Sequence, residues 1–455
     1  MQTFAFHTYG CQMNVRESEA AARALLDAGF LPAPTEEAAD IVIVNSCSVR
    51  GKAEDKAIGK LGILCFSKKE RPTRIVGVMG CMAQRLGEAL FTKLPTLDFS
   101  IGTRCADKIV DAVYTALQSG TPTLALRGLE ETPYAGSGHV TNGGFSAFVT
   151  ILLGCNRRCT YCIVPDVRGS EWSRPAREIL AEVRTLAEAG VKEITLLGQS
   201  IMNYGLRTPA FDEADSPSPG HYQIPFTRLL EAVAAIPGIE RIRFTSGHPS
   251  GVTPELIRLF VEEPKLCHHL HLPVQSGSTR VLERMRRGYT REHYLNAVQA
   301  LQSAVPDMAI TTDVIVGFPG ETEADFEETR TLMGIARFDN SFIFKYSPRP
   351  GTISATWEDD VSEEEKARRN QILLGDQDVR GTVLNQTLVG KVQRVLAEGP
   401  SLRNATRWSG RTSGNKIVIF PASDRYHAGD FLDLTITRVA PQTLYADERQ
   451  SSFSL

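Results

Sequence analysis

The sequence predicts an α/β protein with an N-terminal parallel βαβ domain, a central barrel of six βα units and a small C-terminal β-barrel. Three observations lead to this prediction. Apolar strand patterns alternate with helical periodicity in residues 1–117 and again in residues 145–375. Residues 118–144 between them are rich in Gly, Thr, Ser and Pro, which is typical of a linker. Residues 376–447 end in short strands with Gly-containing turns, which favour a small barrel.

The composition is ordinary for a globular protein. The 455 residues are 42% hydrophobic and 23% charged, and this length predicts about two to four domains. The formal net charge of -3 means that contact with a nucleic acid would need a local basic patch. No apolar run reaches the roughly 18 residues that span a bilayer, and no signal peptide is evident. Nine cysteines without a secretion signal indicate a reducing, cytoplasmic location.

The first domain repeats a strand, a cysteine and a helix three times. The strands are predicted at residues 3–8, 41–45 and 74–79, and the helices at residues 18–28, 52–64 and 84–94. Cys11, Cys47 and Cys81 follow the three strands, about one βαβ unit apart. Because parallel strands end at the same edge of a sheet, the three thiols can converge there. The pattern favours a metal cluster over three buried core cysteines, which would fall within strands.

The central domain contains six strand patterns that alternate with helix patterns. The strands are predicted at residues 148–153, 193–197, 241–245, 269–274, 308–316 and 341–346, and the helices at 176–189, 226–235, 254–262, 291–304 and 323–336. Six βα units predict a partial, open TIM-like barrel, in which chemistry takes place at the C-terminal ends of the strands. Residues 206–223, rich in Pro, Ser and Asp, are predicted as a loop or lid.

Three cysteines lie just beyond the first of these strands. Cys155, Cys159 and Cys162 have the spacing C-x3-C-x2-C. Thiolates are soft ligands suited to iron–sulfur clusters or zinc. Three thiolates hold three corners of a 4Fe-4S cube and leave one iron open, whereas a structural zinc ion takes four ligands. No fourth Cys or His lies nearby in the sequence, which favours the cluster.

A charged helix and a small barrel are predicted at the C-terminal end. The helix is expected at residues 362–385 and the strands at 388–396, 416–420 and 433–437. Trp408 and Tyr426 are available for stacking on nucleic-acid bases. Local basic character comes from Arg403, Arg407, Arg411, Lys416 and Arg425. RNA binding and simple packing against the central domain are equally compatible with this pattern.

The segment around Cys155 resembles the radical S-adenosylmethionine (SAM) superfamily. The signature of that superfamily is the C-x3-C-x2-C spacing with an aromatic residue before the third cysteine, which is Tyr161 here. The resemblance implies that the open iron chelates the amino and carboxylate groups of SAM. Reductive cleavage of SAM would then give a 5′-deoxyadenosyl radical.

The whole chain resembles the methylthiotransferases, which combine an N-terminal three-cysteine domain, a radical-SAM core and a C-terminal TRAM domain. Residues 8–14 and 197–205 match the branch that converts N6-isopentenyladenosine at position 37 of tRNA to its 2-methylthio form. Ser200 stands where that branch usually has Asn, and Ser48 where it often has Thr. The alternatives are methylthiolation of threonylcarbamoyl-adenosine in tRNA or of a ribosomal-protein aspartate, and a non-enzymatic iron–sulfur protein that binds RNA.

The resemblance implies two 4Fe-4S clusters and SAM as cofactors. Cys11, Cys47 and Cys81 would hold an auxiliary cluster. Cys155, Cys159 and Cys162 would hold the cluster that binds SAM. Gly198 and Gln199 lie where radical-SAM enzymes bind the SAM amino group. Gly317 and Gly320 would let the backbone approach the adenine or ribose of SAM, and a plain turn is the alternative. No catalytic side chain is expected, because the cofactor carries out the hard step.

The implied partners are the anticodon stem-loop of tRNA, a reductant such as flavodoxin or ferredoxin, and an unidentified sulfur donor. Candidate phosphate contacts follow the cysteine loop, at Arg157, Arg158, Arg168, Arg174 and Arg177. A zinc site at His269 and His271 near Cys267 is less compatible with the pattern than polar side chains inside an enzyme barrel. Cys65, Cys105 and Cys267 are expected to be free thiols, and the protein is expected to be a monomer.

Overall fold

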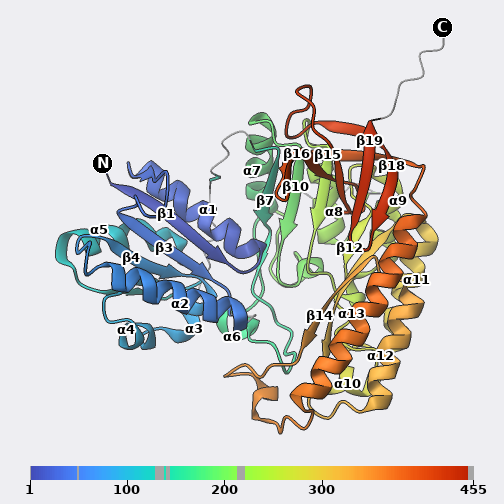
Figure 1. The fold of residues 1–455 in the computed structure, drawn as a ribbon, viewed down its shortest axis with the longest axis horizontal. Helices are drawn as coiled ribbons and strands as arrows, with labels where there is room; N and C mark the ends of the chain where they lie inside the picture. Colours follow the sequence, from blue (N-terminus) through green and yellow to red (C-terminus); the bar gives the residue numbers. More distant parts are fainter. Residues whose placement is uncertain (1, 49–50, 129–137, 140–143, 213–220, 449–455) are drawn as a thin grey trace.

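The computed structural model has three domains, which follow one another along the chain (Figure 1). The structure describes residues 2–48, 51–128, 138–139, 144–212 and 221–448. Part of the predicted loop at 206–223 and part of the predicted linker at 118–144 therefore lie outside the described residues. None of the described helices is long and apolar enough to cross a lipid bilayer.

A six-stranded parallel sheet forms the N-terminal domain, in the order β2-β1-β3-β4-β5-β6. The strands are β1 (Thr3–Tyr9), β2 (Leu31–Pro32), β3 (Ile41–Ser46), β4 (Ile75–Met79), β5 (Phe99–Ile101) and β6 (Thr123–Ala125). The helices are α1 (Gln12–Asp27), α2 (Gly51–Ser67), α3 (Cys81–Leu86), α4 (Ala89–Lys93), η1 (Ala106–Lys108) and α5 (Ile109–Ser119). Every residue of β3 and β4 is buried, as expected for uninterrupted apolar strands of a parallel sheet with both faces covered.

Two features of this domain differ from the sequence pattern. The helix expected at residues 84–94 is two helices, because Gly87 has a φ of +50° that interrupts the helical path. β6 pairs with β5, so the sheet extends into the range that the sequence predicted as a linker. A strand of three residues is too short for its periodicity to show in the sequence.

Two three-stranded parallel sheets, β11-β10-β7 and β12-β13-β14, form the central domain. Its strands are β7 (Ser146–Thr150), β8 (Leu152–Leu153), β9 (Trp172–Ser173), β10 (Glu193–Leu197), β11 (Arg241–Phe244), β12 (His269–His271), β13 (Ala309–Val316) and β14 (Asn340–Lys345). Its helices are α6 (Val164–Arg168), α7 (Ala176–Glu188), η2 (Ile201–Asn203), α8 (Pro225–Ala234), η4 (Pro249–Gly251), α9 (Pro254–Glu262), α10 (Thr279–Arg284), α11 (Arg291–Ala304), α12 (Glu323–Ala336) and η5 (Ile353–Thr356). A backbone bridge from Ile242 to Leu266 joins the two sheets, which confirms the partial barrel of six βα units.

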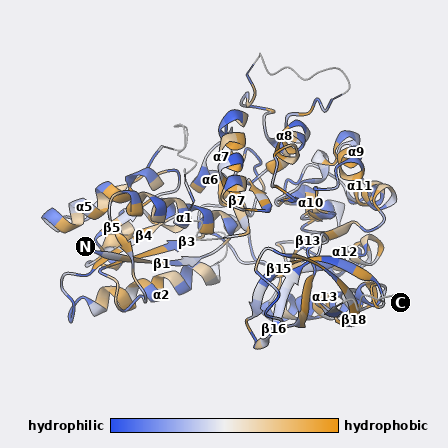
Figure 2. Ribbon diagram, turned by 90° about the horizontal axis from the view of Figure 1, so that it is seen from above, coloured by the Kyte–Doolittle hydropathy of each residue, from blue (hydrophilic) through white to orange (hydrophobic). Residues whose placement is uncertain are grey.

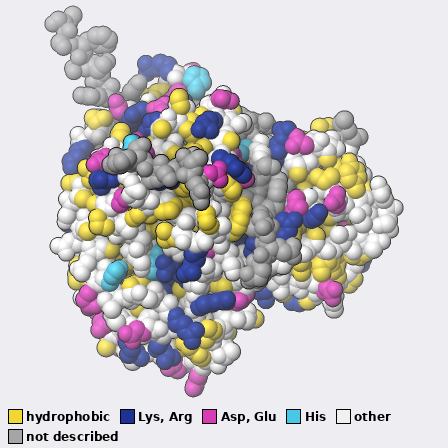
Figure 3. All heavy atoms as spheres, turned by 180° about the vertical axis from the view of Figure 1, so that it is seen from behind, with side chains coloured by type: hydrophobic (Ala, Val, Ile, Leu, Met, Phe, Trp, Pro, Cys, Tyr) yellow, Lys and Arg dark blue, Asp and Glu magenta, His cyan; other side chains and the backbone are white. Residues whose placement is uncertain are grey.

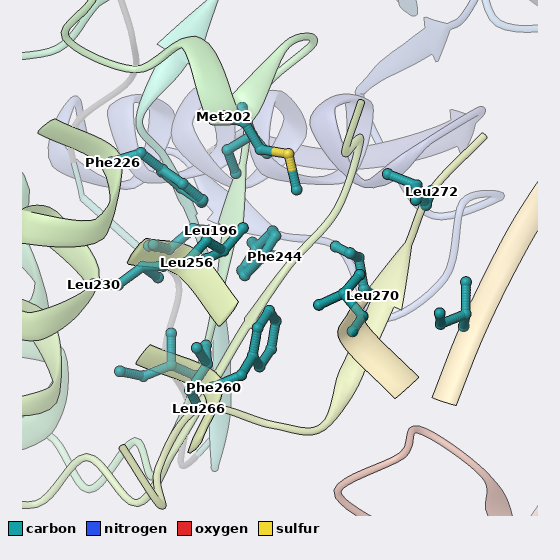
Figure 4. Packing of buried hydrophobic residues seen from close by; sticks show 14 of the residues in the cluster. Leu196, Met202, Phe226, Leu230, Phe244, Leu256, Phe260, Leu266, Leu270 and Leu272 are labelled. Carbon is teal, nitrogen blue, oxygen red and sulfur yellow. The ribbon is translucent and has the colours of Figure 1, made fainter. Parts of the chain in front are cut away.

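Aromatic and aliphatic side chains fill the space between the central strands and their helices (Figure 4). The ring of Phe244 on β11 is edge-on to that of Phe226 on α8, with centroids 5.0 Å apart, and lies 6.0 Å from the ring of Phe260 on α9. Figure 2 shows that the helices carry both hydrophobic and hydrophilic residues, as expected for helices that pack one face on a core. Burial of each such ring contributes roughly 1.5–3 kcal/mol, so this core fixes the loops at the strand ends.

A closed five-stranded barrel, in the order β15-β16-β17-β19-β18, forms the C-terminal domain and confirms the predicted small barrel. Its strands are β15 (Val392–Ser401), β16 (Asn404–Arg411), β17 (Ile417–Pro421), β18 (Phe431–Ala440) and β19 (Thr443–Glu448). The preceding helix, α13 (Glu363–Gln386), runs across the boundary that the sequence placed between residues 375 and 376. Only β15, β17 and β18 were predicted, because polar residues interrupt the alternating pattern of β16.

Two buried arginines on β11 fasten the C-terminal barrel to the start of the central strands. Arg241 and Arg243 donate four hydrogen bonds of 2.7 to 2.8 Å to its main chain. The acceptors are the carbonyl oxygens of Arg394, Arg411, Thr412 and Ser413. Arg243 also pairs with buried Glu193 at 2.9 Å. The C-terminal barrel therefore covers the strand starts, at the opposite end from the cysteine loop (Figure 1).

The N-terminal domain docks on the central domain through α1. Glu182 of α7 accepts a hydrogen bond from Arg16 of α1 at 3.3 Å and contacts His139 at 2.5 Å. Arg174 pairs with the second oxygen of the same carboxylate. All four side chains are at least nine-tenths buried, so their charges must compensate one another across the interface.

Candidate metal centres

Cys11, Cys47 and Cys81 come together at the carboxyl edge of the N-terminal sheet. Cys11 caps α1 after β1, Cys47 follows β3, and Cys81 begins α3 after β4. The thiol of Cys47 is in hydrogen-bonding contact with the thiols of both other cysteines. The parallel topology thus brings together three residues that are far apart in the sequence, as expected for strand ends. Their role as cluster ligands stays a prediction.

Two glycines and two asparagines allow this close approach. A Cβ at Gly10 would lie 2.6 Å from the Cβ of Cys47, and a Cβ at Gly80 would lie 2.3 Å from Oδ1 of Asn45. Both glycines have positive φ, at +146° and +95°. Asn14 donates to Oδ1 of Asn45 at 2.8 Å, and Asn45 donates to the main-chain oxygen of Asn14 at 2.9 Å. These buried amides tie the first turn of α1 to the end of β3.

Arg168 provides positive charge beside these thiols. Its guanidinium is buried and donates to both carboxylate oxygens of Glu17, at 2.7 and 3.3 Å. The hydrogen bond from Cys47 lowers the pKa of Cys11 to about 6, with help from Arg168 and against the effect of burial. The same hydrogen-bonding and charge effects lower the pKa of Cys81. Cys11 and Cys81 therefore favour the thiolate, the form that binds metal, whereas the hydrogen bonds that Cys47 donates to them raise its own pKa.

The loop with Cys155 is held by the strand ends around it. Gly154 has a φ of +79°, and its N–H donates to Oε1 of Gln199 at 2.6 Å. Gln199 therefore orients the residue before Cys155, in addition to the SAM contact predicted for it. A Cβ at Gly198 would lie 3.2 Å from the Cβ of Leu152, so close packing also favours glycine there.

Two side chains from other segments reach the thiols of this loop, Ser200 after β10 and Arg287 after α10. Arg287 donates to Sγ of Cys159 at 3.4 Å, and the hydroxyl of Ser200 lies 3.4 Å from Sγ of Cys155. Burial raises the pKa of Cys162 to about 12 and also raises that of Cys155. The sequence has no local signal for Arg287, which lies 128 positions after Cys159. Ser200, noted as a departure from the related branch, contacts a predicted ligand.

The two thiol sets face each other across the domain interface. Cys81 packs against Ile163 and Val167, which follow Cys162 in the loop and in α6. Met13, next to Cys11 in α1, packs against Leu153 at the end of β8. Hydrophobic side chains therefore join the carboxyl edge of the first sheet to the mouth of the central barrel.

Tyr161 and the turn after β13 pack together. The ring of Tyr161 is edge-on to that of Phe318, with centroids 6.4 Å apart. Gly317 and Gly320, on either side of this contact, have φ of +70° and +79°. A Cβ at Gly317 would lie 2.2 Å from Cγ of Lys366, so the turn requires glycine for packing as well as conformation. The predicted SAM contact of these glycines stays a prediction.

The histidines on β12 have partners within the barrel. Both His269 and His271 contact the hydroxyl of Thr311, at 3.3 and 3.0 Å, and His271 lies 3.4 Å from Asp313. In the described part of the chain, no three Cys, His, Asp or Glu side chains group as ligands of a single metal ion. The two thiol sets do not form such a single-ion site either, and their predicted occupant is a cluster of four irons. The other three cysteines, Cys65, Cys105 and Cys267, are buried.

The structure corrects part of the predicted phosphate contacts. Arg168 is buried in an ion pair with Glu17 of the N-terminal domain and Arg174 in one with Glu182 of its own domain, so the prediction that they contact phosphates is wrong. The sequence could not separate them from Arg158 and Arg177, whose side chains are each 71% exposed. Figure 3 shows Lys and Arg interspersed with Asp and Glu on the back face.

The basic residues of the C-terminal barrel also divide into two groups. Arg411 and Lys416 are in ion pairs, with Glu398 at 2.9 Å and Asp339 at 2.5 Å. A cavity of about 260 Å³ lies at Tyr426 and is lined by Phe420, Pro421, Ala422, Ser423, Arg425, Tyr426 and Leu434. Exposed Arg425 and the half-buried ring of Tyr426 therefore lie together on this part of the barrel surface.

Three family models match consecutive parts of the chain. Residues 3–102 match the uncharacterized protein family UPF0004, residues 149–333 match the radical SAM superfamily, and residues 386–447 match the TRAM domain. These ranges correspond to the N-terminal sheet, the central barrel and the C-terminal barrel.

Relatives in the curated collection match over nearly the full length. The tRNA-2-methylthio-N(6)-dimethylallyladenosine synthase of Akkermansia muciniphila is 45% identical, covering 96% of this chain and 97% of the relative. Enzymes of the same name from Methylacidiphilum infernorum and Geobacter metallireducens are 42% and 44% identical. They cover 98% and 97% of this chain, and 94% and 97% of their own length.

Among solved structures, the fold is similar to a radical S-adenosylmethionine methyltransferase from Kitasatospora setae with cobalamin and a [4Fe-4S] cluster bound. The TM-score is 0.53 at 12% identity, over 78% of this chain and 74% of that chain. At this identity the likeness concerns the fold alone.

Proposed function

The chain belongs to the family of tRNA-2-methylthio-N(6)-dimethylallyladenosine synthases, and we propose that it converts N6-isopentenyladenosine at position 37 of tRNA to the 2-methylthio derivative. The protein is a transferase of the radical SAM superfamily that uses 4Fe-4S clusters and SAM. The observation that carries the proposal is the 45% identity to such an enzyme over nearly the whole chain. The two facing thiol sets fit this activity, because sulfur transfer and hydrogen removal must take place at one substrate carbon.

The residues present fit two clusters. We assign the auxiliary cluster to Cys11, Cys47 and Cys81, and the SAM cluster to Cys155, Cys159 and Cys162. Each set has thiol donors on a buried strand edge and a buried arginine beside it, Arg168 or Arg287, as a negatively charged cluster requires. When bound, the clusters and SAM supply a carbon radical and sulfur, which can replace the unactivated hydrogen of adenine C2.

The position of the C-terminal barrel constrains how RNA can bind. Arg241 and Arg243 hold this barrel at the strand starts, and the cysteine loop lies at the strand ends. The eight residues of β13 span about 26 Å at roughly 3.3 Å per residue. An RNA that contacts both regions therefore runs along the outside of the central barrel. A folded stem-loop, rather than a single nucleotide, matches this separation, and exposed Arg158 and Arg177 lie at its far end.

The proposal includes partners outside the chain. Reduction of the SAM cluster needs a one-electron donor such as flavodoxin or ferredoxin, and replacement of consumed sulfur needs a separate sulfur donor. Each thiol set is complete within one chain, which supports a monomer as the active unit. A tRNA substrate implies a cytoplasmic location.

Mass spectrometry of tRNA from a strain that lacks this gene tests the proposal. We expect the 2-methylthio derivative to disappear and N6-isopentenyladenosine to accumulate. The wild-type gene should reverse both changes, and the Cys159→Ala variant should reverse neither. Unchanged 2-methylthio adenosine would contradict the proposal. Loss of a methylthio group from threonylcarbamoyl-adenosine or from a ribosomal-protein aspartate would favour those alternatives.

Iron content and product analysis test the two assignments separately. Two clusters predict about eight irons per reconstituted chain, and replacing Cys155, Cys159 and Cys162 by Ala should leave about four. The Cys47→Ala variant should still cleave SAM to 5′-deoxyadenosine with dithionite, but should yield no methylthio product on RNA with N6-isopentenyladenosine. Methylthiolation at the normal rate by this variant would contradict the auxiliary assignment.

A further inference from the structure

The two thiol sets differ in the net charge of the side chains around them. Beside Cys11 and Cys81, the guanidinium of Arg168 is paired with the carboxylate of Glu17 through two hydrogen bonds. The pair as a whole has no net charge, so Glu17 reduces the positive field of Arg168 at the thiols.

Beside Cys159, the guanidinium of Arg287 has only neutral partners other than the thiol. Its Nε donates to the hydroxyl of Tyr289 and its Nη2 to the main-chain oxygen of Pro273, both at 3.1 Å, and its Nη1 donates to Sγ of Cys159 at 3.4 Å. Among the residues that the structure describes, no carboxylate oxygen lies within 4.0 Å of this guanidinium. The residue is only 8% exposed.

A second arginine adds charge of the same sign. Arg157 lies in the cysteine loop, two positions after Cys155, and its charge acts on both Cys155 and Cys159. Its Nε is buried, and within the described part of the chain this atom has no hydrogen-bond partner. Two cations, Arg157 and Arg287, thus lie at one thiol set, together with one buried carboxylate, that of Glu171, which acts on Cys155 and Arg157 and leaves a net positive charge.

We propose that Arg287, assisted by Arg157, raises the reduction potential of the cluster at Cys155, Cys159 and Cys162 above that of the cluster at the N-terminal set. The inference rests on the proposed function, since it requires both clusters. A cluster gains one negative charge on reduction, and a buried cation that donates to a ligand sulfur stabilises that form. Arg287 is a positioning residue in this role, because it acts through Cys159.

The arrangement has a consequence for where an electron resides. Each set has three thiols, so the thiols alone would leave a single electron shared between the two clusters. The uncompensated charge of Arg287 shifts this equilibrium toward the set in the central barrel, whose reduction the proposed chemistry needs. The Arg168–Glu17 pair, which has no net charge, shifts the equilibrium less.

Redox titration followed by electron paramagnetic resonance tests this proposal on full-length chains that hold one cluster each. Replacing Cys11, Cys47 and Cys81 by Ala leaves only the signal of the cluster in the central barrel. Replacing Cys155, Cys159 and Cys162 by Ala leaves only the signal of the cluster in the N-terminal domain. The cluster in the central barrel should have the higher midpoint potential. In Arg287→Gln its reduction equilibrium constant should fall at least tenfold, or about 59 mV for one electron. Arg287→Lys, which keeps the charge, should lie closer to the parent.

Arg157→Gln provides a second measurement if Arg287→Gln fails to assemble its cluster, since the loss of Arg157 Nε breaks no described hydrogen bond. Arg157→Gln should lower the midpoint potential of the cluster in the central barrel by less than Arg287→Gln does. The matched control, Glu17→Gln with Arg168→Gln, removes a neutral pair and should change the N-terminal potential less than threefold. Unchanged potentials in the Arg287→Gln and Arg157→Gln chains would overturn the proposal. If the parent chains bind no iron, the proposed function itself fails, which iron analysis detects separately.

Discussion

The two interfaces on either side of the central domain are built from different groups. At the C-terminal barrel, Arg241 and Arg243 donate mainly to main-chain carbonyls, which cannot titrate. At the N-terminal domain, one carboxylate, that of Glu182, is shared by Arg16, Arg174 and a histidine. The comparison shows that one interface is built mainly on hydrogen bonds to main-chain carbonyls, whereas at the other the buried acids Glu182 and Glu17 pair with cationic side chains.

A histidine at each interface extends the difference. Burial lowers the pKa of His139, but its contacts with Glu182 and Glu19 outweigh this effect and raise the pKa. Burial and the neighbouring charge of Arg243 both lower the pKa of His269. The first site thus favours the protonated ring and the second the neutral ring.

Removing Arg243 should cause the largest loss of stability at either interface. Arg243→Met leaves the buried carboxylate of Glu193 and two carbonyl oxygens without their donor, which should cost about 3–5 kcal/mol. We expect a lower thermal midpoint and faster proteolysis of the C-terminal barrel. Arg394→Met is the control at the same interface, because its side chain is 62% exposed and its pair with Glu240 is worth about 0–1 kcal/mol. Equal effects of the two changes would contradict this account.

Neutralising Glu182 should have a smaller effect at the other interface. In Glu182→Gln the amide oxygen still accepts one hydrogen bond and His139 can lose its proton, so the cost should be about 1.5–3 kcal/mol. Hydrogen exchange of α1 should accelerate while that of β15 stays unchanged. The matched control is Glu178→Gln, whose carboxylate is 49% exposed and pairs with the same arginine, Arg174, at 3.4 Å. If α1 were equally affected in the control, the shared carboxylate would not be the main contact.

The fold was largely predictable because most strands and helices are long enough for periodicity to show. The helices α9, α11 and α12 begin and end at the predicted residues. The convergence of Cys11, Cys47 and Cys81 also followed from topology, since each lies just beyond a parallel strand, whereas Cys155, Cys159 and Cys162 are neighbours in one loop. β5 and β6 have three residues each and β16 has little apolar alternation, so local patterns could not reveal them.

The charges around the site were not predictable for a different reason. The burial of Arg168 and Arg174 depends on Glu17 and Glu182, which lie on other segments. Arg287 reaches Cys159 only through the closure of the barrel. No local pattern distinguishes a buried arginine from one on the surface, so a sequence of mixed charges predicts a basic patch where the fold makes ion pairs.

The response of the two interfaces to pH should be the smallest effect and have opposite signs. The proton on His139 stabilises docking fully below the unfolded pKa of about 6.5, and this contribution is lost as pH rises through the raised pKa. His269 behaves in reverse, because below about 6.5 the unfolded state binds a proton that the folded site excludes. The charged groups that face the ring of His139 are Glu182, Glu19 and Arg16. Those that face the ring of His269 are Arg243, His271, Arg411 and Lys416.

Hydrogen exchange, corrected for the intrinsic effect of pH, measures both responses on one sample. As the pH rises above about 6.5 and through the raised pKa of His139, protection of α1 should fall while that of β12 stays constant. Between about pH 6.5 and 5, protection of β12 should fall, and α1 should keep its protection because the pKa of Glu182 is lowered to about 2. One proton changes at each histidine, so neither slope should exceed about 1.4 kcal/mol per pH unit. His139→Gln should abolish only the first response and His269→Gln only the second. Responses of the same sign at both interfaces would show that overall charge, not these two rings, controls the docking of the domains.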